Sequence, residues 1–257
     1  MRNLKRTLSL ALASVMLVGM MSVGASAVNA SDFTDADEIV NKDAVSTMTA
    51  LGIINGKEDG SYFDPTGNVT RAEMAKMLCV AINGGVDPVL GVKDTPTFTD
   101  IKGTWAESYI EYCAANGIIA GRGNNKFDPT GTVSATEAAK MLLGVLGYNA
   151  EKSGLVGNDW AINTNVLANQ NGLYKNLANL NANTLLTRDN AAQMIYNALD
   201  ANMVELNAAG NYTTSQYSYT GTESVVTGTE RVWVVKIKDS SVNDAVKALD
   251  GSVYNSR

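Results

Sequence analysis

The sequence predicts a mainly α fold, in which three helix–loop–helix repeats form one pseudo-threefold helical unit, followed by a partial β-containing tail. Three observations support this prediction. Short segments recur in the same order along the chain, each copy carries an apolar stripe with helical spacing, and the composition changes after residue 206. The 257 residues, of which 45% are hydrophobic, are sufficient to bury a core.

Residues 1–27 are expected to form a secretory signal peptide. Three basic residues among the first six precede an apolar run from Leu8 to about Met21, and Ala25-Ser26-Ala27 offers a cleavage site. The alternative, a membrane anchor, is less favoured because the run is short for a span of ~20 residues. We therefore predict a secreted chain without membrane association after cleavage.

The repeats are predicted over residues 31–90, 95–150 and 155–206. Phe33-Thr34-Asp35 of the first copy recurs as Phe98-Thr99-Asp100 of the second. The loop Phe63-Asp64-Pro65-Thr66-Gly67 recurs identically from Phe127 to Gly131. The third copy is diverged and has no such loop. Since one helix pair cannot bury its apolar stripe alone, the copies are expected to pack against one another.

The second helix of each repeat has the clearest signals. Thr70 with Glu73, and Ser134 with Glu137, form capping boxes, and Thr187 with Asn190 is a weaker variant. Apolar residues then follow at helical spacing. They are Met74, Met77, Leu78, Ala81 and Ile82; Ala138, Met141, Leu142, Val145 and Leu146; and Ala191, Met194, Ile195, Ala198 and Leu199. Gly52 and Gly117 fit the C-caps of the first helices.

Residues 207–257 are predicted to be a linker and the start of a β-rich region. The segment 211–229 is rich in Thr, Ser, Tyr and Gly, and Val232–Ile237 has the composition of a strand. Residues 244–249 are compatible with a short helix. Because a lone strand is unstable, the tail is expected to pair elsewhere or to begin a domain that continues beyond the fragment.

Several function classes are excluded by composition. Histidine is absent, which removes Ser-His-Asp and Cys-His catalysis, and we predict no enzyme, no cofactor and no metal site. The net charge of −6 argues against nucleic-acid binding. Cys79 and Cys113 are expected to be buried free thiols, with a disulfide as the alternative.

The repeated pattern resembles the S-layer homology family. The resemblance rests on Phe-x-Asp at Phe33 and Phe98, Trp105 shortly afterwards, Gly-Ile-Ile-x-Gly, Phe-Asp-Pro, and Thr70-Arg71-Ala72-Glu73. It implies three repeats in one pseudo-threefold unit, with grooves between adjacent repeats. It further implies non-covalent binding of secondary cell-wall polymers in these grooves, often through a pyruvylated sugar. The predicted location is the cell wall or S-layer of a bacterium.

The resemblance also implies ligand-binding arginines. Arg71 matches the family's Thr-Arg-Ala-Glu sequence in full, Arg188 matches in part, and Ala135 takes the arginine position in the second copy. A guanidinium group suits a carboxylate ligand because it can donate two parallel hydrogen bonds. The alternative is that each arginine is a surface residue or a partner of a glutamate.

Four further residues are candidates for the same site. Trp105 and Trp160 offer flat apolar surfaces for a sugar, although packing near a helix start explains them at least as well; Val40 takes their position in the first copy. Asp35 and Asp100 could contact ligand, but we favour a structural role in which each caps or braces the following helix.

The leading hypothesis is an anchoring module whose partner is a secondary cell-wall polymer or a peptidoglycan-linked glycan. Two alternatives stay open. The repeats could anchor an exo-enzyme whose catalytic domain lies beyond residue 257, or they could anchor an S-layer lattice protein that self-assembles through regions outside the repeats.

Overall fold

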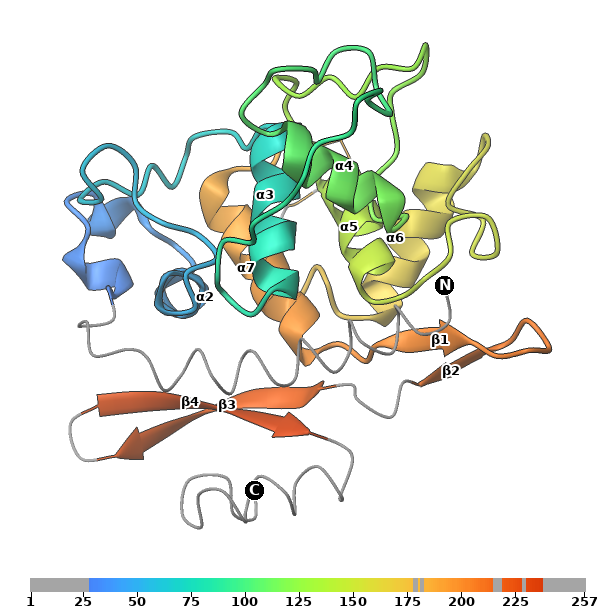
Figure 1. The fold of residues 1–257 in the computed structure, drawn as a ribbon. Helices are drawn as coiled ribbons and strands as arrows, with labels where there is room; N and C mark the ends of the chain where they lie inside the picture. The colour runs from blue at the N-terminus through green and yellow to red at the C-terminus, as the bar shows by residue number, and fades with distance from the viewer. Residues whose placement is uncertain (1–27, 178–179, 181–182, 215–218, 228–229, 238–257) are drawn as a thin grey trace.

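The structure is a computed structural model that describes residues 28–177, 180, 183–214, 219–227 and 230–237. The predicted signal peptide and the predicted short helix at 244–249 lie outside these residues. Six α-helices and four strands are arranged within the described part (Figure 1). None of these helices combines the length and the apolar character that crossing a bilayer requires.

The three predicted helix pairs are present. Two 3-10 turns precede the first pair, and short strands follow the last one. The helical elements are η1 (Ala30–Asp32), η2 (Ala36–Glu38), α2 (Lys42–Ala50), α3 (Arg71–Ile82), α4 (Glu107–Ala115), α5 (Ala135–Val145), α6 (Trp160–Gln170) and α7 (Arg188–Asp200). The strands are β1 (Val204–Leu206), β2 (Tyr212–Thr214), β3 (Tyr219–Thr227) and β4 (Glu230–Ile237).

The predicted helix boundaries are confirmed. Thr70, Ser134 and Thr187 are the N-caps of α3, α5 and α7, and the first two form complete capping boxes. Gly52 and Gly117 follow the ends of α2 and α4 with φ of 70° at both residues. A side chain is rarely accommodated at such a positive φ, so glycine ends these helices at low cost.

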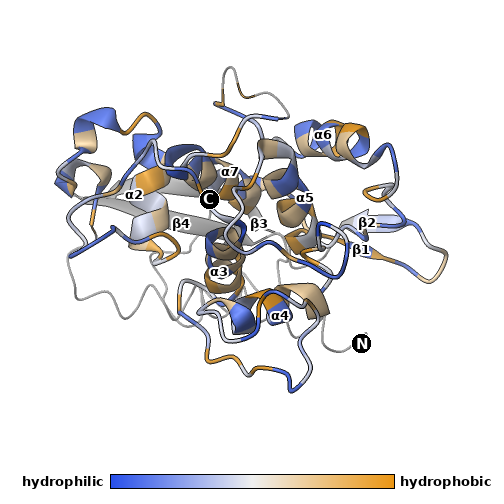
Figure 2. Cartoon of the chain, turned by 90° about the horizontal axis from the view of Figure 1, so that it is seen from above, coloured by the Kyte–Doolittle hydropathy of each residue, from blue (hydrophilic) through white to orange (hydrophobic). Residues whose placement is uncertain are grey.

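Helices pack across the copies as well as along the chain. The first helix of each copy contacts the second helix of the preceding copy: α4 contacts α3, α6 contacts α5, and α2 contacts α7. Seen from above, α3, α5 and α7 lie at the centre and α2, α4 and α6 lie outside them (Figure 2). The order therefore closes on itself, as expected for a pseudo-threefold unit.

The apolar stripes of α3, α5 and α7 supply the centre of the core. Met74, Leu78, Leu142 and Met194 are almost completely buried. The aromatic rings of the two identical loops are also fully buried, with Phe63 and Phe127 at 0% exposure. The loops are thus part of the folded unit, because their rings are inserted into the same core.

The two cysteines are both buried as free thiols, as favoured by the sequence. Cys79 lies on α3 and Cys113 on α4, and their Sγ atoms are 3.4 Å apart. Their mutual hydrogen bond, together with burial, holds the pKa of the Cys113 thiol well above its usual value.

The tail contains two antiparallel hairpins. Strands β1 and β2 pair across the predicted boundary at residue 207, and the Val204 amide donates to the Leu146 carbonyl after α5. The predicted strand at 232–237 falls within β4, which pairs with β3. The segment 219–227, which lies within the predicted linker and start of a β-rich region, is a strand and supplies the partner that β4 needs.

Candidate functional site

The starts of α3, α5 and α7 meet in a closed ring of backbone hydrogen bonds. The Val69 amide donates to the Leu186 carbonyl at 2.9 Å, and the Val133 amide donates to the Val69 carbonyl at 3.0 Å. The Leu186 amide donates to the Val133 carbonyl at 2.9 Å, which completes the cycle. Each repeat thus contacts both others at this point, and the three junctions between repeats start from equivalent positions.

Arg71 joins the first repeat to the loop of the second. Its Nε donates to the Phe127 carbonyl at 2.8 Å, and its Nη2 donates to the Ala120 carbonyl at 2.7 Å. The guanidinium carbon lies 4.4 Å from the centroid of the Phe127 ring. The Nη1 atom is 3.3 Å from a carboxylate oxygen of Glu137. The guanidinium group thereby fixes one loop by its backbone and by its ring.

Arg188 joins the third repeat to the loop of the first in the same way. Its Nε donates to the Phe63 carbonyl and its Nη2 donates to the Asn55 carbonyl, both at 2.8 Å. The guanidinium carbon lies 5.1 Å from the Phe63 ring centroid. Two equivalent junctions are therefore built on one arginine each.

The third junction has neither part of this arrangement. Ala135 begins α5 where the other copies have arginine, and its amide donates to the Thr184 carbonyl of the third copy. The third copy is also the one whose sequence lacks Phe-Asp-Pro-Thr-Gly. The missing arginine and the missing loop thus face each other, so the two absences match across one junction.

Both arginines are buried, which rules out the surface position that the sequence left open. Arg71 is 3% exposed and Arg188 is 6% exposed. Burial is the main influence on their guanidinium groups and lowers the pKa of both. The contact of Arg71 with Glu137 fits the glutamate partner that the sequence left open. The other donors of both arginines are directed to carbonyls of the next repeat, so neither group is freely presented to solvent.

Asp35 and Asp100 hold the loops of their own repeats. The carboxylate of Asp35 accepts from the amides of Phe63 and Asp64, and that of Asp100 accepts from Phe127 and Asp128. Our expectation that each caps or braces the following helix is wrong, because Asp35 makes no side-chain cap bond to η2 and the N-cap of α4 is Ala106. The structural role itself stands, but its target lies 28 residues further along the chain for Asp35 and 27 for Asp100.

The aromatic candidates lie at the surface of the repeats. Trp105 is 60% exposed and its ring centroid is 6.3 Å from that of Tyr109. Trp160 is half-buried at the start of α6, with the Lys140 ammonium 5.1 Å from its ring centroid. Val40, in the same position of the first copy, is 82% exposed. This position is therefore exposed in the first two copies and half-buried in the third.

Sequence analysis missed Arg122, an exposed residue at the first junction. Its guanidinium donates to both carboxylate oxygens of Glu137, at 2.9 and 2.8 Å, and to Asp128 at 2.6 Å. The signal was available, because Arg122 follows Gly-Ile-Ile-Ala-Gly as Lys57 follows Gly-Ile-Ile-Asn-Gly, and each cation pairs with an aspartate of its own loop.

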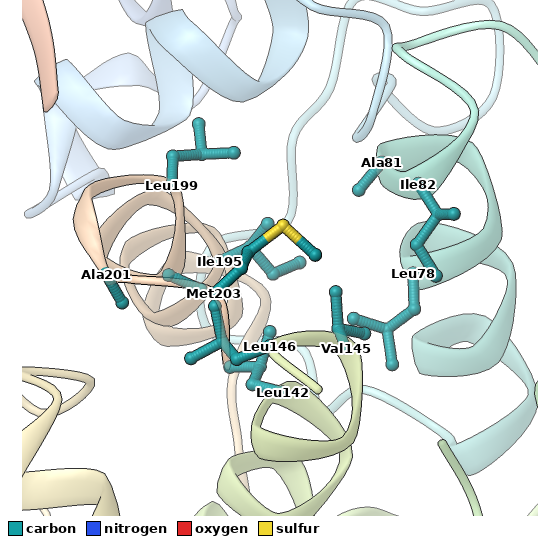
Figure 3. Close-up of a pocket in the computed structure, with 11 residues that line it drawn as sticks. Leu78, Ala81, Ile82, Leu142, Val145, Leu146, Ile195, Leu199, Ala201 and Met203 are labelled. Atoms are coloured by element: carbon teal, nitrogen blue, oxygen red, sulfur yellow. The ribbon is translucent and has the colours of Figure 1, made fainter. Parts of the chain in front are cut away.

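An apolar pocket lies at the opposite ends of the central helices (Figure 3). It is lined by the last turns of α3, α5 and α7, including Leu78, Leu142 and Ile195, and by Met203 after α7. Among the residues that the structure describes, no charged side chain lines this pocket. It is therefore unsuited to an anionic ligand, and the charged groups gather at the helix starts instead. No cluster of three potential metal ligands occurs among the described residues.

The closed set of helix–loop–helix repeats with charged junctions defines a helical repeat module. The family model for the S-layer homology domain matches residues 32–75 and 97–139. The chain therefore contains S-layer homology domains, and it belongs to the bacterial cell wall or S-layer. These domains anchor surface proteins and are not catalytic; in general they bind cell-wall polymers. The matches fall on the first two repeats.

The curated relatives of this chain include an S-layer protein, a cell surface protein and an exoglucanase. The chain is 32% identical over 111 residues to an S-layer protein of Bacillus licheniformis, covering 43% of this chain and 12% of that protein. It is 28% identical over 207 residues to a cell surface protein of Thermoanaerobacter kivui, covering 80% and 26%. It is 29% identical over 156 residues to exoglucanase XynX of Acetivibrio thermocellus, covering 57% and 14%. The chain thus spans a minor part of each relative.

Proposed function

We propose that the chain anchors an exported protein non-covalently to the cell wall by binding an anionic secondary cell-wall polymer between its repeats. Pyruvylated glycans are included in this ligand class. The observation that carries the proposal is the closed ring of repeats, which sets equivalent junctions between the copies at the helix starts, with Trp105 exposed on the second repeat. The match to an anchoring family supports it.

The proposed site combines positioning residues with exposed ones. Arg71 and Arg188 hold the loops that form the walls of two junctions, and any direct contact to ligand is limited to the edge of each guanidinium. The carboxylates of Asp35 and Asp100 hold the same two loops by accepting hydrogen bonds from their backbone amides. Trp105 offers an exposed indole to a sugar ring, because aromatic faces pack well against apolar sugar faces.

Local charge must overcome the acidity of the whole chain. With a net charge of −6, long-range attraction of an anionic polymer is unfavourable. Short-range donors therefore carry recognition, and the partial positive ends of α3, α5 and α7 lie at the same end of the unit. We expect binding to weaken only moderately with salt, since buried contacts are screened less than exposed ones.

Co-sedimentation with purified sacculi tests the proposal. The wild-type chain is expected to sediment with sacculi that carry secondary polymer and to stay in solution with sacculi stripped of it. Trp105→Ala should weaken binding by about fivefold, as expected for the loss of about 1 kcal/mol of stacking. Val40→Ala is the matched control, because Val40 occupies the same exposed position in the first copy.

Equal retention on stripped and unstripped sacculi would contradict the proposal. If Trp105→Ala and Val40→Ala weaken binding equally, the indole of Trp105 has no specific role in binding the polymer.

The relatives include both lattice proteins and enzymes, which keeps two wider architectures open. One relative is an S-layer protein and another is the endo-1,4-beta-xylanase A of Thermoanaerobacterium saccharolyticum, which shares 29% identity over 149 residues. In either architecture this chain supplies the anchor. The reading frame of the full gene separates them: short strands would favour a lattice, and paired acidic residues in a larger domain would favour an enzyme.

A further inference from the structure

The junction between the second and third repeats lacks an arginine, but it has another cation. Lys140 lies on α5, and its ammonium faces the indole of Trp160 at the start of α6. The distance from Nζ to the ring centroid is 5.1 Å, within the range of a cation–π interaction. A lysine of the second repeat and a tryptophan of the third are thus brought together without the Phe-Asp-Pro loop.

Lys140 differs from the neighbouring cations because no carboxylate neutralises it. The nearest acidic group on its helix, Glu137, already accepts from Arg122 and Arg71. Arg122 also pairs with Asp128. Among the described residues, no carboxylate forms an ion pair with Lys140. The charges of Arg71 and Arg122 are therefore balanced by Glu137 and Asp128. The half-buried ammonium of Lys140 is left without an ion-pair partner among the described residues.

The environment of Lys140 disfavours its charge. Burial lowers the pKa of its ammonium, and the nearby charge of Arg71 lowers it further, while Glu137 opposes the change. An anion placed beside the ammonium would remove this penalty. Such an uncompensated cation is a feature that a ligand can complete, since desolvated charge pairs with good geometry are stronger than exposed ones.

The equivalent lysine of the first repeat shows the contrast. Lys76 occupies the same position on α3 and lies 5.4 Å from the ring centroid of Tyr109. Its ammonium also pairs with Asp87 at 3.0 Å. The hydrogen bond to Asp87 raises the pKa of Lys76, the opposite direction from Lys140. Both repeats therefore hold a lysine against an aromatic ring, but only the first supplies its own acid.

We propose that Lys140 and Trp160 form an anion-binding site for an acidic sugar at the junction of the second and third repeats. The site replaces the arginine that is missing at Ala135. The carboxylate of the sugar pairs with the ammonium, and the indole supplies an apolar wall for the sugar ring. The inference rests on the proposed function and identifies the residues that carry it at this junction.

Paired neutralising variants test the inference. Lys140→Gln and Lys76→Gln remove the same charge from equivalent positions, and each is assayed by sedimentation with polymer-bearing sacculi. Lys140→Gln is expected to weaken binding about tenfold, the loss of one charge-assisted contact. Lys76→Gln is expected to stay within about twofold of wild type, because its charge is already paired with Asp87. Lys140→Arg should restore most of the affinity.

The outcomes separate the inference from the proposed function. If wild type prefers polymer-bearing sacculi but Lys140→Gln binds equally well, the anchoring function stands and the Lys140 site is overturned. If both lysine variants lose binding equally, the effect is general charge and the site is also overturned. If wild type shows no preference, the proposed function fails first. Thermal unfolding of each variant checks that the fold is retained.

Discussion

The three junctions between repeats are related by position but not by chemistry. At two of them a buried arginine crosses to the next repeat, where it binds two carbonyls and covers a phenylalanine ring. At the third, the Ala135 amide donates to the Thr184 carbonyl of the next repeat, and alanine has no side-chain donor to add. The ring of backbone hydrogen bonds is the same at all three junctions. Backbone hydrogen bonds therefore close the unit, and the arginine side chains hold the individual loops.

The comparison indicates that the arginine and the loop are one structural unit. An arginine without the loop would be a buried charge without acceptors, and a loop without the arginine would leave buried carbonyls without donors. Losing both together is the less costly change. The pattern in the sequence, in which the second copy lacks one part and the third copy lacks the other, follows from this pairing across repeats.

Arg71→Ala is expected to have the largest effect. The substitution leaves the Phe127 and Ala120 carbonyls without their donors and opens a space above a buried ring, which should cost about 3 kcal/mol of unfolding free energy. Urea denaturation followed by circular dichroism measures the change. Arg122→Ala is the control, since this exposed arginine should cost less than about 1 kcal/mol. Equal losses in both variants would show that burial at the junction is not what matters.

Ala135→Arg tests the empty junction and should have the next largest effect. Ala135 is 1% exposed, and the third repeat has no Phe-Asp-Pro-Thr-Gly sequence to receive a guanidinium. We expect a loss of about 2 kcal/mol from overpacking and from an unmatched buried charge. Ala135→Met, which adds bulk without charge, separates the two causes. An increase in stability with arginine would refute the pairing of arginine with loop.

The helices could be predicted from sequence because their signals are local. Thr70 and Glu73 lie within one turn, the apolar stripes repeat at short spacing, and Gly52 follows its helix directly. These features depend on neighbours that any window of the sequence contains. The pseudo-threefold arrangement could be predicted from the repeats, because three recurring apolar stripes are buried only when the copies pack against one another.

The candidate site could be predicted only in part, because its partners are distant in sequence. Arg71 was identified, but the carbonyls that it binds lie 49 and 56 residues away. Asp35 was assigned to the following helix because that helix is its nearest neighbour in sequence. Its carboxylate instead accepts from the Phe63 amide, 28 residues later, which no short sequence window contains. Lys140 and Lys76 look alike in sequence; the Asp87 partner of Lys76 and the Arg71 charge near Lys140 make them different.

The smallest expected effect concerns the carboxylate that holds the second loop. Burial raises the pKa of Asp100, but the hydrogen bonds from the Phe127 and Asp128 amides outweigh it and leave the pKa below its ordinary value of 3.8. Because the folded pKa is depressed, the stabilisation is complete above about pH 4 and is lost as the pH falls through the folded value. Asp100→Asn keeps one acceptor and should cost about 1 kcal/mol at pH 7.

The difference between Asp100→Asn and wild type should therefore shrink on acidification, as the wild-type carboxyl becomes protonated and loses the same interaction. Urea titrations at pH 7 and at pH 3 measure this convergence. A constant difference between the two proteins over this range would mean that the charge of Asp100 does not hold the loop. In that case the Arg71 side of the junction would fasten the loop alone, and the second loop would depend on the first repeat more than on its own.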